Sequence, residues 1–161
     1  MLPFKKILWP TDFSKASFRA LIAARELADH FSAELLMLHV VVPVPQMPLP
    51  GSTSSSNEPS SSFNVNEYRK ELEKYGTQAL EELVRNEVGT GISVRTVILH
   101  GQAPDQIAAF AEKEDVDLIV IATHGLTGLK RFVFGSVTDK VMKIAPCPVL
   151  LADVKKQKDE E

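Results

Sequence analysis

Short apolar runs recur along the chain and predict five β-strands. They occupy residues 7–9, 35–42, 93–99, 118–122 and 149–151. The runs at 35–42 and 118–122 are apolar almost throughout, without polar residues at alternate positions. This composition is typical of strands that are covered on both faces of a parallel sheet. Pro10 directly follows the first run, so the first strand is expected to stop there.

Stretches with an apolar residue at every third or fourth position separate the strands and predict four helices. Ser14 is a suitable N-cap for the first helix, Pro104 suits the first turn of the third, and Pro146 ends the fourth. Strands that alternate with helices predict an α/β fold with a doubly wound parallel sheet. The helices are expected from Ser14 to Phe31, from Tyr68 to Leu83, from Pro104 to Ala111 and from Gly135 to Ile144.

Two segments have no apolar period. Residues 43–64 contain five of the ten prolines, and positions 52–62 contain seven serines, which predicts a flexible loop between the second strand and the second helix. A loop of this length is either functional or disordered, and the composition favours disorder. Residues 154–161 form a charged tail. The folded domain is therefore expected to span residues 1–153.

Composition narrows the class of protein. A chain of 161 residues fits one domain, and its net charge of −3 gives no general electrostatic case for binding nucleic acid or acidic membranes. Cys147 is the only cysteine, so an internal disulfide is excluded and a reducing compartment is favoured. There is no signal-like apolar N-terminus and no run long enough to span a membrane. A cytoplasmic protein is expected.

The candidate chemistry lies after the first and fourth strands. Ligands of open parallel sheets bind beyond the carboxyl ends of strands, where the strand order reverses. Residues 10–14 and 122–138 follow the first and fourth strands. In the second segment Gly125 and Gly128 allow tight turns, Lys130 and Arg131 are cationic, and Ser136 is placed to cap a helix whose first amides suit a phosphate.

Taken alone, these residues are explained better by ordinary structure than by phosphate binding. Glycines and a serine cap also build simple strand-to-helix connections, and the sequence has neither a P-loop nor a G-x-G-x-x-G fingerprint. Asp12 is placed to cap the first helix, His39 is expected to be a structural histidine, and Cys147 a small core residue. No catalytic triad is apparent, and His30 and His100 have no partner at a metal-ligand spacing.

The chain resembles the universal stress protein family from its first strand to its last. The resemblance lies in residues 7–14, Leu38-His39-Val40, residues 123–137 and residues 146–150. ATP-binding members have the motif G-x2-G-x9-G-[ST], and here nine residues separate Gly125 from Gly135-Ser136. Ala122 stands in place of the first glycine, where a methyl group would crowd a ligand or strain a backbone that needs positive φ. Gly128 lies outside this register.

The resemblance implies a fold, a ligand and an assembly. It implies one five-stranded parallel sheet in the order 3-2-1-4-5 with helices on both faces, and ATP as ligand, accompanied by Mg²⁺ or Mn²⁺. Two copies would form a homodimer through the fifth strand, Pro148 to Ala152. The implied nucleotide-binding residues are Pro10, Thr11, Asp12, Val40, Ala122, His124, Gly125, Gly135, Ser136, Val137 and Thr138.

Three functions stay open. The first is a nucleotide-responsive stress module without dedicated catalysis, in which ATP changes the surface that the dimer presents. The second is an enzyme that hydrolyses ATP slowly, although the loop after the fourth strand has no carboxylate cluster for two metals. The third is a nucleotide-free dimerisation module in which Ala122 marks a lost site.

Overall fold

The computed structural model of the protein describes residues 2–43, 64–123 and 135–152. Its strands form one sheet in which every pair of neighbours is parallel, in the order β3-β2-β1-β4-β5. This order confirms the prediction. The strands are β1 Lys6–Thr11, β2 Glu34–Val41, β3 Val94–His100, β4 Leu118–Ala122 and β5 Val149–Ala152.

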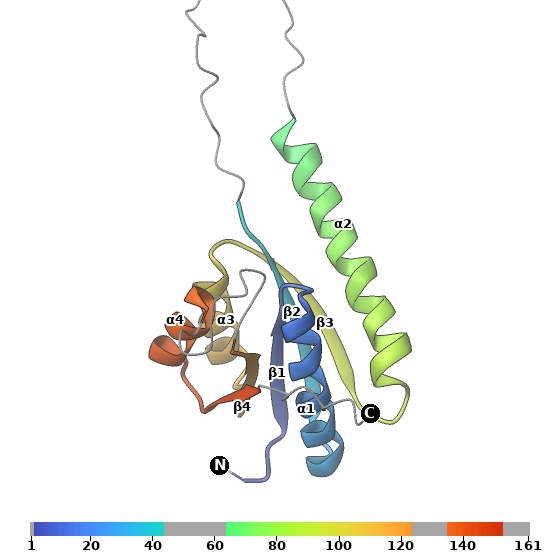
Figure 1. Ribbon diagram of the computed structural model, residues 1–161, viewed down its shortest axis with the longest axis vertical. Helices are drawn as coiled ribbons and strands as arrows, with labels where there is room; N and C mark the ends of the chain where they lie inside the picture. The colour runs from blue at the N-terminus through green and yellow to red at the C-terminus, as the bar shows by residue number, and fades with distance from the viewer. Residues whose placement is uncertain (1, 44–63, 124–134, 153–161) are drawn as a thin grey trace, which may run out of the picture.

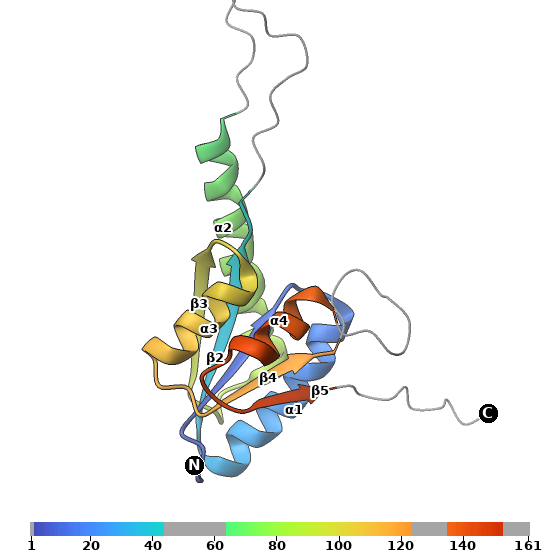
Figure 2. The ribbon, with the colours of Figure 1, turned by 90° about the vertical axis from the view of Figure 1, so that its left-hand side faces the viewer.

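The helices cover both faces of this sheet, as predicted (Figure 1). α1 (Lys15–Phe31) and α2 (Val65–Leu83) lie on one face, with the short π-helical turn η1 (Val84–Val88) after α2. α3 (Ala103–Lys113) and α4 (Ser136–Ile144) lie on the other. Figure 2 shows α4 beside β4 and β5, with α1 on the far side of those strands.

Strand alternation divides the core into two layers. Ile7 and Trp9 of β1 pack with α1, whereas Leu8 between them packs with α3 and α4, because successive side chains of a strand point to opposite faces. All three side chains are fully buried. The apolar strands β2 and β4 are covered in the same way, which is the arrangement that their continuous apolar runs predict.

The prediction that Pro10 stops the first strand is wrong. β1 continues through Pro10 to Thr11, and Pro10 pairs in register with Leu38 of β2. On its other side β1 pairs with β4 only at Ile7 and Leu8. The main-chain carbonyl of Lys6 points toward β4, because it accepts from Asp117 N. Main-chain groups of a strand alternate between its two neighbours, so the main chain of Pro10, four residues on, also points toward β4. The absence of an N–H on Pro10 is tolerated because the hydrogen bonds between β1 and β4 end before this residue.

The apolar stripe expected on α2 is only partly the buried face. Tyr68 and Tyr75 are exposed, and the buried residues of the helix are Gly76 and Leu80. A Cβ at Gly76 would lie 3.0 Å from Cδ2 of His39 and 3.1 Å from Cδ1 of Ile98. The helix therefore approaches the sheet closely at a glycine, which a search for apolar side chains does not detect.

Ser14 is the N-cap of α1, as predicted, and its side chain accepts from Ser17 N. Within the described ranges, none of the helices combines the length and the apolar character that crossing a membrane requires.

Candidate functional site

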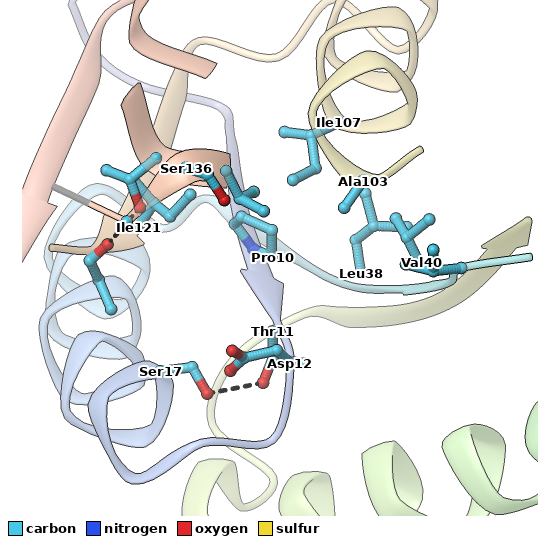
Figure 3. Close-up of a pocket in the computed structure, with 15 residues that line it drawn as sticks. Pro10, Thr11, Asp12, Ser17, Leu38, Val40, Ala103, Ile107, Ile121 and Ser136 are labelled. Carbon is cyan, nitrogen blue, oxygen red and sulfur yellow. Dashed lines mark hydrogen bonds between the residues drawn. The ribbon is translucent and has the colours of Figure 1, made fainter. Parts of the chain in front are cut away.

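A cavity of about 270 Å³ opens where β1 and β4 diverge, at the carboxyl ends of the central strands (Figure 3). Nine of the predicted site residues line it, although they come from segments more than a hundred positions apart. They are Pro10, Thr11, Asp12, Val40, Ala122, Gly135, Ser136, Val137 and Thr138. The predicted site residues His124 and Gly125 lie outside the described residues, as do Gly128, Lys130 and Arg131.

One side of the cavity is apolar. Leu38 and Val40 of β2 face Ala103 and Ile107 of α3 across it (Figure 3), and Ile121 of β4 continues the same surface. Sequence reasoning missed all of these except Val40. For Leu38 the signal was strand alternation, since it lies two positions from Val40 on the same strand and shares its face. This side suits a flat, apolar group whose polar edge meets main-chain atoms.

The opposite side is the N-terminus of α4. The N-cap is Gly135, not Ser136 as predicted, and no side chain caps the helix. The first intrahelical bond is from Asp139 N to Gly135 O, so the amides of residues 136–138 have no partner within the helix. These donors and the positive end of the helix dipole suit an anion.

The glycine at this N-cap is not needed for its backbone conformation. Gly135 has φ −58° and ψ 151°, which any residue adopts, so a side chain there would not strain the backbone. Its N–H donates to the carbonyl of Thr123 at 3.0 Å, which ties the start of α4 to the end of β4. Gly135 lines the cavity next to the free amides and adds no side chain there.

The alanine that replaces the first motif glycine causes no strain. Ala122 ends β4 in extended conformation, paired with Ala152, and its side chain belongs to the core under α1. Its carbonyl accepts from Thr138 Oγ1 at 2.8 Å. The hydroxyl hydrogen of Thr138 is therefore used inside the protein, so Thr138 lines the cavity as a link between α4 and β4.

Thr11, at the end of β1, also donates its hydroxyl hydrogen to a group inside the protein. Ser17 Oγ donates to the carbonyl of Ser14 at 2.8 Å, so the contact of 2.9 Å between Thr11 and Ser17 is donated by Thr11 (Figure 3). Thr11 Oγ1 also accepts from Phe13 N at 2.9 Å. Thr11 has no hydrogen left for a ligand. Sequence reasoning missed Ser17, which is buried in α1.

Asp12 is the one charged side chain among the described residues that line the cavity. Its Oδ1 accepts from Ser14 N at 2.9 Å, which forms a turn just before α1. The cap of the helix is Ser14, so the interpretation of Asp12 as its cap is wrong, and the Asp12 side chain stays exposed. Asp105 of α3 and Lys140 of α4 form an ion pair of 2.9 Å that joins the two helices beside the cavity. The described residues contain no group of three or more His, Cys, Asp or Glu that could hold a metal ion.

The two residues for which we expected structural roles lie away from the cavity lining. His39 contacts the carbonyl of Thr11 through Nδ1 at 2.9 Å, so Nδ1 carries the hydrogen and the prediction of a structural histidine is confirmed. Cys147 packs against the core on the α3 side. Burial, together with the charge of Asp117, raises the pKa of its thiol, which makes it a poor nucleophile at neutral pH.

The sequence matches one family over nearly all of its length. The model of the Universal stress protein family covers residues 3–153. A universal stress protein of Methanocaldococcus jannaschii is 38% identical over 98% of this chain and 85% of its own length. The universal stress protein YxiE of Bacillus subtilis is 33% identical over 92% of this chain and 98% of its own.

Solved structures share the fold. Universal stress protein UspA from Lactobacillus plantarum superposes with a TM-score of 0.75 at 25% identity, over 93% of this chain and 98% of its own. A universal stress protein from Archaeoglobus fulgidus in complex with dAMP gives 0.59 at 22% identity, over 95% and 100%. An Arabidopsis thaliana family member with AMP bound gives 0.64 at 20% identity, over 98% and 96%.

Proposed function

Because this chain belongs to the universal stress protein family, we propose that its cavity binds an adenine nucleotide, with ATP as the natural ligand. The observation that supports this most is the composition of the cavity. An apolar surface between β2 and α3 lies in the same cavity as the uncapped N-terminus of α4, at the point where β1 and β4 diverge. A nucleotide has the matching parts, a flat base at one end and phosphates at the other.

Each part of the cavity has a role in this proposal. The base lies against Leu38, Val40 and Ile107, with its polar edge at the main chain of Val40. The phosphates accept from the free amides of residues 136–138 and from the exposed hydroxyl of Ser136. Asp12 accepts from the ribose hydroxyls. The bound nucleotides of the Archaeoglobus and Arabidopsis proteins, dAMP and AMP, support the choice of adenine.

The number of carboxylates in the cavity limits whether the protein itself can hold the divalent cation that accompanies ATP. Asp12 is the one carboxylate among the described lining residues, which is too few for a resident divalent ion. Mg²⁺ or Mn²⁺ would arrive bound to the ATP phosphates and keep most of its water ligands. Its chemical contribution is to neutralise phosphate charge, while the chain positions the nucleotide.

We further propose that the bound nucleotide is a signal rather than a fuel in a cytoplasmic stress response. Thr11, Thr138 and Ser17, the buried hydroxyls at the cavity, have their hydrogens committed to internal bonds. Among the described lining residues no imidazole or amine is placed to activate water. Hydrolysis slower than about 1 s⁻¹, near the low end of ordinary enzymes, is expected.

The proposed assembly is a homodimer formed through β5. This strand lies at the edge of the described sheet and pairs only with β4 there. Leu150 on it is 40% exposed. An apolar edge strand invites pairing, and a second copy across a two-fold axis would cover it.

Titration calorimetry tests the proposal on the purified protein. We expect ATP to bind, and both GTP and inorganic triphosphate to bind more weakly because neither presents adenine to the apolar side. Gly135→Val should weaken ATP binding by about 2 kcal/mol or more, on the order of thirtyfold, since the side chain fills the space beside the amides. Gly91→Val, at an open surface position, is the control. A wild-type protein that binds no ATP would refute the proposal and favour a nucleotide-free module.

A further inference from the structure

Three aromatic rings connect α2 to the loop that contains Asp12. Phe13 directly follows Asp12, and its ring lies on the imidazole of His39 with centroids 4.5 Å apart. Tyr75 of α2 also contacts the Phe13 ring, edge to face, with centroids 6.2 Å apart and planes at 82°. The cavity-lining loop is thus supported from the face of the sheet opposite to α3.

Phe13 needs this support because of its backbone. Its φ of 60° lies in the left-handed region, which an aromatic residue seldom adopts. Such a conformation persists only where the surroundings enforce it. Here the N–H of Phe13 donates to Thr11 Oγ1, and its ring contacts both His39 and Tyr75. Without these contacts the loop would relax to an ordinary φ and move Asp12.

His39 transmits the position of α2 to the same loop. Its Nδ1–H donates to the carbonyl of Thr11, and its neighbour Val40 lines the cavity on the opposite face of β2. The Cδ2 of His39 is 3.0 Å from where a Cβ of Gly76 would lie. A shift of α2 toward or away from the sheet therefore changes the space available to His39.

The buried contacts of α2 with the sheet lie in its C-terminal half, and one exposed contact joins Glu73 to His100 of β3 at 3.3 Å. Gly76 and Leu80 are its buried residues, whereas residues 65–75 contain none. Figure 1 shows the first turns of the helix extending past the sheet. Tyr75 and Gly76 thus lie where the docked half of α2 meets the exposed half. An element with few buried contacts can move at small cost in free energy.

We propose that Phe13 and His39 are positioning residues for the nucleotide cavity, and that docking of α2 on them regulates nucleotide affinity. This inference rests on the proposed function of the cavity. Docked α2 holds Phe13 and thereby holds Asp12 where it meets the ribose. Coupling between sites is reciprocal, so a nucleotide that favours the held loop also favours docked α2.

Four variants separate this inference from a purely structural role. Tyr75→Ala removes an exposed ring and should weaken ATP binding about fivefold, whereas Tyr75→Phe keeps the ring and should bind within twofold of wild type. Gly76→Val displaces His39 and should weaken binding tenfold or more. Gly91→Val adds the same side chain in open space and should change nothing. Calorimetry gives the affinities, and circular dichroism confirms that each variant is folded.

Hydrogen exchange gives the reciprocal measurement. ATP should slow amide exchange in residues 72–80 of the wild-type protein, and this protection should be reduced in Tyr75→Ala. A stability defect alone would accelerate exchange with and without ATP and leave the affinity of the folded protein unchanged. If wild type binds ATP while folded Tyr75→Ala binds equally well and α2 shows no protection, the inference is wrong. If wild type does not bind ATP, the proposed function and the inference both fail.

Discussion

At the level of single residues, the hydroxyl groups around the cavity divide into two kinds. Thr11 and Thr138 have hydroxyl groups that could contact a ligand, and the resemblance assigns them that role. In the structure their hydrogens go to Ser17 and to the carbonyl of Ala122. Ser136 is exposed at the start of α4 and makes no side-chain cap. The sequence could place all three at the site, but only the folded structure shows which group accepts each hydroxyl hydrogen.

This division predicts opposite effects for two substitutions. Thr138→Val should lower the free energy of unfolding by about 1–3 kcal/mol, because it leaves the buried carbonyl of Ala122 without its donor. The affinity of the folded variant for ATP should stay close to wild type. Ser136→Ala should leave stability within about 0.5 kcal/mol of wild type and weaken ATP binding by roughly 0.5–2 kcal/mol.

Urea denaturation and calorimetry on the two variants measure both quantities. The account is contradicted if Thr138→Val abolishes ATP binding in the folded protein while Ser136→Ala does not affect it. That result would make Thr138 a direct phosphate donor.

At the level of elements, periodicity located each α-helix and strand that the structure describes, but it missed the short turn η1 and misjudged how two of the elements pack. Pro10 was expected to end β1, because sequence gives no sign that the neighbouring ladder with β4 has already ended. The buried face of α2 is set by Gly76, a residue with no side chain to show in an apolar pattern. Both errors concern relations between elements rather than the elements themselves.

An ion pair connects β3 to the end of α3 and predicts a pH effect. Arg95 donates to Glu114 at 2.6 Å and lowers the pKa of that carboxyl below its ordinary value of about 4.5. The folded protein therefore binds this proton less tightly than the unfolded chain does. The stabilisation is present above pH 4.5 and is lost as the pH falls through the lower folded value.

Glu114→Gln should accordingly lower the urea midpoint at pH 7, and its difference from wild type should shrink as the pH falls below about 4.5. Glu112→Gln, at an exposed position of the same helix, is the matched control and should show no such difference. A difference between wild type and Glu114→Gln that is constant from pH 7 to pH 3 would rule out the ion pair as its cause.

The edge strand β5 predicts the effect of a charge on assembly. Leu150→Lys places an ammonium group at the proposed dimer contact and should shift the protein from dimer to monomer at micromolar concentration. Leu2→Lys changes a leucine that is more exposed still, at the start of the chain, and should leave the dimer intact. Light scattering after size-exclusion chromatography measures the mass. A wild-type monomer, or a dimeric Leu150→Lys, would contradict the proposal.

At the level of the whole molecule, the site results from topology. Its lining comes from both ends of the chain, because the order β3-β2-β1-β4-β5 places β1 beside β4 and lets them diverge. Sequence motifs predicted the residues at those two strand ends. They could not predict Ala103 and Ile107, whose place at the cavity depends on how α3 packs across β2. The predicted residues His124 and Gly125 lie outside the described part of the chain.

The most direct test of the central claim is an NMR titration of the isotope-labelled protein with ATP. The account predicts that the largest amide shifts fall on Val40, on residues 136–138 and on the loop around Asp12, and that they are lost in Gly135→Val. Smaller shifts are expected in α2 near Tyr75. A spectrum unchanged at millimolar ATP, or shifts confined to surfaces away from the ends of β1 and β4, would contradict the claim that this cavity is a nucleotide site.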